Sequence, residues 1–198
     1  SSLISDLTEK IELKEILNAL PDATFIIDKE GRIIFWNDAM EALTDVKGDD
    51  VIGQKCQDFS IRIYGEERPI LVDLALNSQL LQEHENKYLS IEKKYETLTA
   101  LVFVPHLKAE GIYLWAKARP LHDSEGNIIG AIESLRDITD TMRMQNQLKE
   151  RLKKLNCLYE VIRLINHPVI SINEILEGVT ELIPSAMRYP RLAGTRLI

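Results

Sequence analysis

The most informative part of the sequence runs from Leu98 to Asp137 and reads LTALVFVPHLKAEGIYLWAKARPLHDSEGNIIGAIESLRD. It holds three apolar runs long enough to be β-strands, which we expect at residues 98–107, 112–121 and 128–137. Short polar joints that end in glycine separate the runs, and such joints are typical of tight antiparallel connections. The stretch therefore predicts three consecutive antiparallel strands.

Two further strands are expected nearer the N-terminus, at residues 23–27 and 32–36, joined by Asp28-Lys29-Glu30-Gly31. Asn37 follows them at a position that suits a helix N-cap, ahead of a short helix over residues 38–43. Strands in groups of two and three, with short helices between the groups, indicate an α+β domain with a five-stranded antiparallel sheet.

Amphipathic helices are predicted on both sides of this domain. Apolar residues recur at helical spacing over residues 3–20, and Pro21 ends that pattern. After the sheet, apolar residues alternate spacings of four and three, as in a short coiled coil (Leu148, Leu152, Leu155, Tyr159 and Ile162). We therefore divide the chain into an N-terminal helix (1–20), the α+β domain (21–139), a linker helix (140–167) and the beginning of a second domain (168–198).

Composition narrows the functional classes. The chain of 198 residues carries a net charge of -7 without a large basic patch, which argues against binding nucleic acid or an anionic membrane surface. No run approaches about 18 apolar residues, so no membrane span is expected. The two cysteines, Cys56 and Cys157, form neither a disulfide framework nor a metal motif, which favours a reducing cytoplasm. Because no catalytic motif is present, we expect no enzymatic activity from this chain.

Several local runs, in their order, resemble the PAS family over about residues 20–140. These runs are Leu20–Asp28, Gly31–Asn37, Val51–Gly53, Ala118–Leu121 and Arg136–Thr139. The resemblance implies a five-stranded sheet with short helices on one face. The runs Arg68–Leu74 and Phe103–His106 look most like PAS units of multi-domain sensor histidine kinases, archaeal ones in particular, and the tail resembles the start of a GAF domain.

The resemblance also implies a function, and it implies two residues that would pass the signal from the sheet to the output helix. A PAS module would couple a small-ligand or redox signal to a dimeric output helix in a two-component phosphorelay, with the kinase domain outside this chain. Asp137 and Thr139 would tie the sheet to that helix. Two alternatives stay open: a ligand-free PAS module for dimerisation and spacing, and a sensor of a non-kinase regulator such as a nucleotide cyclase or transcription regulator.

A ligand pocket would lie between the sheet and its helices, where concave apolar sites are common. Eight residues are candidates for lining this pocket or the core: Phe25, Ile27, Trp36, Met40, Leu43, Phe103, Trp115 and Ile132. The inward face of residues 112–121 stays open, since one parity is small and apolar (Ile112, Leu114, Ala116, Ala118) and the other amphipathic (Tyr113, Trp115, Lys117, Arg119).

No cofactor is identified by motif. His84 is placed where some PAS domains hold a haem ligand, but its polar neighbours favour a surface histidine. Cys56 lacks the Asn-Cys-Arg context of flavin-binding light sensors. His167 is followed by Pro168 and not by the acidic residue of a phosphoacceptor site. The cofactor therefore stays unknown, and haem, flavin and metal lack support.

Overall fold

The computed structural model describes residues 13–166 and 171–186. Contacts within the chain divide it into two compact units, residues 1–139 and 140–198. His167 and most of the predicted N-terminal helix lie outside the described residues. The two units are described separately below.

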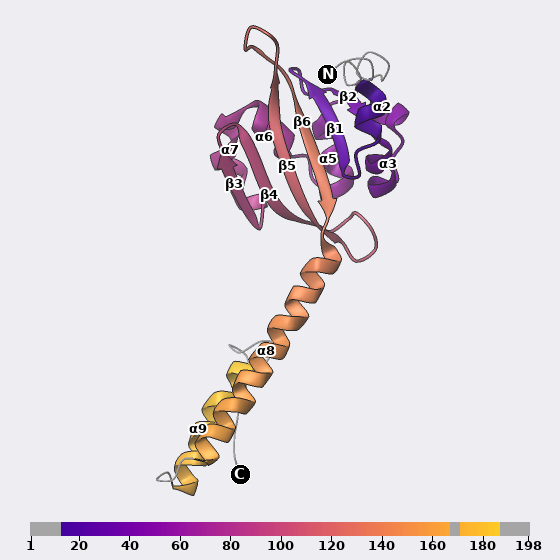
Figure 1. Cartoon of the computed structure of the whole chain (residues 1–198). Helices are drawn as coiled ribbons and strands as arrows, with labels where there is room; N and C mark the ends of the chain where they lie inside the picture. Colours follow the sequence, from indigo (N-terminus) through magenta and orange to yellow (C-terminus); the bar gives the residue numbers. More distant parts are fainter. Residues whose placement is uncertain (1–12, 167–170, 187–198) are drawn as a thin grey trace, which may run out of the picture. The chain divides into compact units, whose positions relative to one another are not determined.

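The first unit is built on one antiparallel sheet of six strands in the order β2-β1-β6-β5-β4-β3 (Figure 1). The strands are β1 (Ala23–Asp28), β2 (Ile33–Trp36), β3 (Ser90–Lys94), β4 (Thr97–Val104), β5 (Ile112–His122) and β6 (Ile128–Asp137). Five of these were predicted, and all five lie in one sheet. The chain returns across the sheet so that β6 lies between β1 and β5, and β6 and β5 form its central pair.

The prediction of five strands is corrected by β3, a sixth strand at the sheet edge. Its residues are mostly polar and exposed, with Lys93 and Lys94 at its end. Charged side chains are typical of an edge strand, because they discourage pairing with another chain. The turn between β3 and β4 contains no glycine that could have marked it. Tyr95 adopts the left-handed conformation there, with φ of 56°. The strand therefore has no apolar pattern from which it could be predicted.

Short helices cover one face of the sheet. The helices of this unit are α2 (Leu13–Asn18), α3 (Asp38–Thr44), α4 (Gly48–Val51), α5 (Cys56–Tyr64), α6 (Leu71–Leu76) and α7 (Leu81–His84), with 3-10 turns at Ser78–Leu80 and Glu85–Lys87. Helix α6 packs on β4, β5 and β6, and α3 packs on β1. The core lies between these helices and the sheet.

Burial along β5 shows which set of alternate residues faces the core, a question that the sequence left open. Ile112, Leu114, Ala116 and Ala118 are buried on the helix-covered face. The small alanines allow α6 to approach the strand closely. The amphipathic set, from Tyr113 to Arg119, lies on the opposite face of the sheet, as the alternation of a β-strand requires.

Asn37 holds the beginning of this unit together, and its predicted role as N-cap of α3 is confirmed. Its side-chain oxygen accepts hydrogen bonds of 2.9 Å from the backbone N–H groups of Thr24 and Met40. Its amide nitrogen donates to the carbonyls of Asp22 and Leu17. One buried side chain therefore connects the end of α2, strand β1 and the start of α3.

The second unit contains α8 (Thr139–Ile165) and α9 (Ile172–Ala186); the first residue of α8 belongs to the first unit. A predicted capping box begins α9, since Ser171 and Glu174 exchange side-chain-to-backbone hydrogen bonds. Gly178 of α9 lies directly against Leu164 of α8. Across the described residues, none of the helices combines the length and the apolar character that a bilayer crossing requires.

Candidate functional site

The first residue of α8 is hydrogen-bonded to the last two strands of the sheet. The Thr139 hydroxyl accepts a 3.0 Å hydrogen bond from the Tyr113 backbone N–H on β5 and donates at 2.6 Å to the Asp137 carboxylate on β6. Its own backbone N–H donates to the same carboxylate oxygen at 3.0 Å. Thr139 is only 8% exposed, and it is the one buried residue of α8. Both predicted relay residues therefore lie in one network.

The second oxygen of Asp137 accepts a 2.9 Å hydrogen bond from Lys108, in the loop that joins β4 to β5. Partial burial acts to raise the pKa of Asp137, but the hydrogen bonds from Thr139 and Lys108 outweigh it and leave the pKa below its usual range. The carboxylate is thus ionised at neutral pH and joins three elements: β6, the β4–β5 loop and α8.

A buried carboxylate connects the same strand to helix α6. Glu133 lies on the covered face of β6, and its Oε2 accepts a 2.7 Å hydrogen bond from the Val72 N–H. Asp73 caps the same helix, since its Oδ2 accepts from the Ile70 N–H at 2.9 Å. Burial, with a smaller effect from Asp73, raises the pKa of Glu133 to about 8. Burial also raises the pKa of Asp73.

Arg68 and two tyrosines form a second polar group in this interior. The Arg68 guanidinium stacks 3.6 Å from the centre of the Tyr64 ring and 5.6 Å from that of Tyr88. Burial raises the pKa of Tyr64 to about 12 and raises that of Tyr88 further. Glu133 contributes to both shifts, so the two polar groups lie within electrostatic range of each other.

The eight candidate pocket or core residues lie on two faces of the sheet. Phe25, Ile27, Trp36 and Met40 are buried in the core, and Leu43 packs against it. The other three, Phe103, Trp115 and Ile132, belong to strand parities that point to the opposite face, where Phe103 is 38% exposed. These three do not line the interior with the other five, because side chains alternate along each strand.

The residues weighed as cofactor ligands are not brought together. His84 ends α7 and is half-buried among exposed neighbours, whereas Cys56 begins α5 and is buried. Burial raises the pKa of the Cys56 thiol well above its usual value, so the thiol is unreactive at neutral pH. Within residues 13–166 and 171–186, no three His, Cys, Asp or Glu side chains are grouped so as to hold a metal ion.

Sequence reasoning missed the polar interior of Glu133, Arg68 and Tyr88. A signal existed for Glu133, since it shares the parity of the apolar Ala131 and Leu135 on β6. A charged residue at an inward position of a strand is seldom buried without a partner. Arg68 and Tyr88 lie in irregular segments, where no periodic pattern marks a residue as buried.

The fold agrees with comparisons to known proteins. A family model described as the PAS fold matches residues 17–143, and the chain belongs to the PAS family. Halobacterial transducer protein 9 of Halobacterium salinarum is 26% identical over 136 residues, which make up 68% of this chain and 28% of that protein. The chain therefore spans under a third of that relative's length.

Two solved structures are similar to this chain. An RNA-binding Light-Oxygen-Voltage receptor aligns with a TM-score of 0.50 at 15% identity, over 77% of this chain and 38% of that one. The PAS domain of a protein from Colwellia psychrerythraea aligns with a TM-score of 0.44 at 19% identity, over 68% of this chain and 98% of that one. At 15% identity the receptor structure shows the fold alone.

Proposed function

We propose that this chain is the sensory PAS module of a multi-domain sensor histidine kinase, where it couples a small-ligand or redox signal to a dimeric output helix. The observation that carries the proposal is the bond between the Tyr113 N–H and the Thr139 hydroxyl. It joins the sheet to the first residue of α8 by a contact that a shift of β5 would lengthen or break.

The route of the signal would run along β6. A change in the interior alters the position of α6, which is bonded to Glu133. Glu133 and Asp137 lie on the same strand, and Asp137 binds Thr139. Since a β-strand is stiff along its axis, a displacement at Glu133 would reach the start of α8. A small shift at a helix end is enough to bias two arrangements of a packed helix pair.

The partner of α8 would be a second copy of the chain. The coiled-coil stripe of Leu148, Leu152, Leu155, Tyr159 and Ile162 is exposed in the single chain. Helix α9 contacts other residues of α8, including Leu164 and Cys157. Burial of the stripe in a homodimer would remove apolar surface from water. The two free cysteines suit a cytoplasmic location, and the chain itself would carry no catalysis.

A second candidate output is favoured by one observation. The relative from Halobacterium salinarum is named as a transducer protein. The module would then serve a transducer in place of a kinase. The relay from sheet to helix is the same in both candidates, whereas a ligand-free module for dimerisation and spacing would have no relay at all.

Disulfide crosslinking along α8 tests the proposal. In a Cys157→Ser background, Leu148→Cys and Leu152→Cys probe the stripe, and Lys149→Cys is the matched control on the same helix. We expect the two stripe positions to crosslink faster between copies than the control. Adding Thr139→Val should change the ratio of the crosslinking rates of Leu148→Cys and Leu152→Cys, because it removes the hydrogen bond to Tyr113.

Two results would contradict this function. A chain that stays monomeric in light scattering, with equal crosslinking at all three positions, excludes the helix pair. If the protein dimerises but Thr139→Val leaves the crosslinking rates of Leu148→Cys and Leu152→Cys unchanged, the relay is excluded. The dimerisation and spacer role is then favoured.

A further inference from the structure

Arg68 is a buried cation without an acidic partner. It is 7% exposed, and its guanidinium forms no ion pair within the part of the chain that the structure describes. The nearby carboxylate of Glu66 binds Lys87 at 2.8 Å. Other contacts of the Arg68 side chain include the ring and hydroxyl of Tyr64 and a long 3.5 Å hydrogen bond to the Lys87 carbonyl. A buried guanidinium ordinarily has a carboxylate or phosphate group as its partner.

Two donors in this interior also lack an acceptor. The Arg68 Nε and the Tyr88 hydroxyl are both buried without a hydrogen-bond partner among the described residues. Tyr88 is 9% exposed, and its ring lies 5.6 Å from the Arg68 guanidinium carbon. Unsatisfied buried polar groups are rare in folded proteins and mark a missing water, ion or ligand. The Arg68 Nε can only donate and the Tyr88 hydroxyl can donate as well, so one acceptor group would satisfy both.

We infer that Arg68 and Tyr88 bind the carboxylate group of a small organic ligand inside the PAS core. A carboxylate has two acceptor oxygens in one plane, which matches an Nε–H donor and a neighbouring O–H donor, and its charge balances the guanidinium. This inference rests on the proposed sensory function, since it names the class of ligand that the module would detect.

The surroundings favour a singly charged group. Glu133 and Asp73 both act electrostatically on Tyr88, and any negative charge that they carry repels a doubly charged ligand more strongly than a singly charged one. The pKa of Glu133 is raised to about 8, so this carboxyl is neutral at pH 6.5 and does not repel a monoanion. The Tyr64 and Tyr88 rings supply apolar surface for the rest of the ligand.

Thermal shift and calorimetric titration of the whole chain test the inference at pH 6.5 and constant ionic strength. The probes are acetate, hexanoate and benzoate, each paired with its neutral amide (acetamide, hexanamide or benzamide), and inorganic phosphate. At least one carboxylate should raise the melting temperature and bind at least about tenfold more tightly than its amide, as expected for hydrogen bonds to a charged group. Phosphate should bind more weakly than that carboxylate, because it has no apolar part to contact the Tyr64 and Tyr88 rings.

Two variants with matched controls locate the site. Tyr88→Phe should weaken carboxylate binding about tenfold and leave the ligand-free melting temperature unchanged or raised, because it removes an unsatisfied hydroxyl. Arg68→Gln should abolish the carboxylate preference. The controls are Tyr95→Phe, whose tyrosine is 87% exposed, and Arg62→Gln on the exposed face of α5. Both should bind as the unmodified chain does.

The inference fails if no carboxylate binds, if the amides or phosphate bind equally well, or if Tyr88→Phe and Arg68→Gln both keep the preference. It also fails if Tyr88→Phe lowers the ligand-free melting temperature, because the hydroxyl then has a partner within the protein. These results leave the crosslinking of α8 untouched, so failure of this site is distinguishable from failure of the relay.

Discussion

Glu133 and Val72 are separated by 61 positions in the sequence, yet the Glu133 carboxylate accepts a 2.7 Å hydrogen bond from the Val72 N–H. The bond attaches the first turn of α6 to the centre of the sheet. It also buries a carboxyl group whose ionised form is disfavoured by the surrounding apolar core. Protonation of this one group therefore affects stability.

Stability should fall as the pH rises because of Glu133. Its pKa is about 8 in the folded state and 4.5 as the ordinary value. Between these values the folded state binds more protons than the unfolded state, so rising pH favours unfolding. Below this pH range Glu133 makes no contribution to the pH dependence of stability. Above it, the full loss in the free energy of unfolding remains. Within this range the free energy of unfolding should fall by up to about 1.4 kcal/mol per pH unit.

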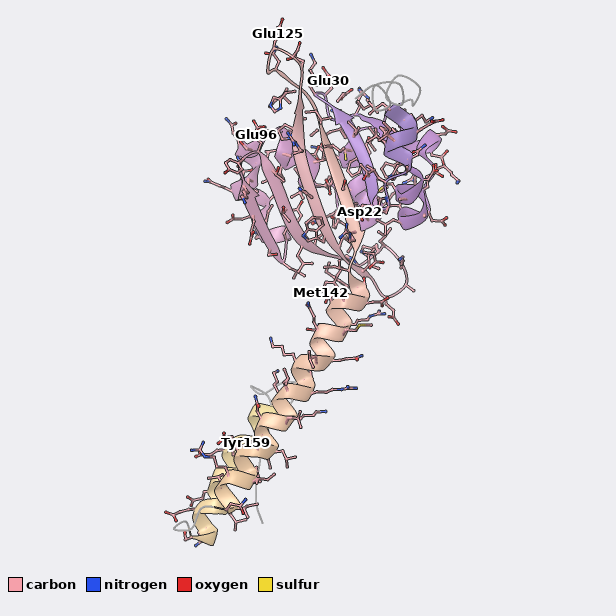
Figure 2. All side chains as sticks on the ribbon, viewed as in Figure 1. Asp22, Glu30, Glu96, Glu125, Met142 and Tyr159 are labelled. Atoms are coloured by element: carbon pink, nitrogen blue, oxygen red, sulfur yellow. The ribbon has the colours of Figure 1, made fainter. Side chains whose placement is uncertain are left out.

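Glu133→Gln should remove this dependence, because the amide oxygen still accepts from Val72 and does not ionise. Urea unfolding from pH 5 to pH 8.5 measures it. The raised pKa of Asp73 has the same sign and leaves a smaller residual slope. Glu125→Gln is the control, since Figure 2 shows Glu125 at the tip of the loop between β5 and β6. Equal slopes for Glu133→Gln and the unmodified chain would exclude Glu133 as the source.

Thr139→Val should loosen the sheet at the start of α8. Valine keeps the shape of threonine but cannot accept from Tyr113 or donate to Asp137. We expect a loss of about 1–2 kcal/mol and faster hydrogen exchange at the Tyr113 amide. Thr139→Ser should retain slow exchange, and Thr141→Val, at an exposed position two residues on, should have no effect. Unchanged protection of the Tyr113 amide in Thr139→Val would contradict the assigned hydrogen bond.

Asn37→Ala should be among the most damaging substitutions in the first unit. It leaves the N–H groups of Thr24 and Met40 without their side-chain acceptor inside the core. The expected loss is about 3 kcal/mol or more, measured by urea unfolding. Asn86→Ala is the control, since Asn86 is exposed on a 3-10 turn. A loss below about 1 kcal/mol would mean that water replaces the amide.

The sequence was sufficient for the elements whose residues follow a regular period. Three strands joined by glycine-containing turns, and Asn37 before a short helix, have local physical causes that can be read from neighbouring residues. The link from Asp137 to Thr139 was also predictable, because it spans two positions. Strand β3 was not, because an exposed polar edge has no apolar alternation.

The polar interior depends on long-range contacts that local patterns do not contain. Glu133 meets Val72 only after β6 has paired with β1 and α6 has packed on the sheet. Arg68 is buried in an irregular segment before α6, where a charged residue ordinarily lies on the surface. The inward parity of β5 also required the position of α6, since both of its faces contain apolar residues.

Gly130→Ala should open the pairing of β1 with β6, because Gly130 lies opposite Asp28 and has no room for a side chain. An added Cβ would collide with the Ile27 carbonyl oxygen. Ile27 is fully buried, so β1 cannot retreat without disturbing the core, and we expect a loss of about 1–3 kcal/mol. Urea unfolding and amide exchange along β1 measure the effect. Ile129→Ala, at the exposed neighbouring position, should leave β1 protected. If Gly130→Ala unfolds at the same urea concentration as the unmodified chain, the two strands are less tightly apposed than the structure indicates.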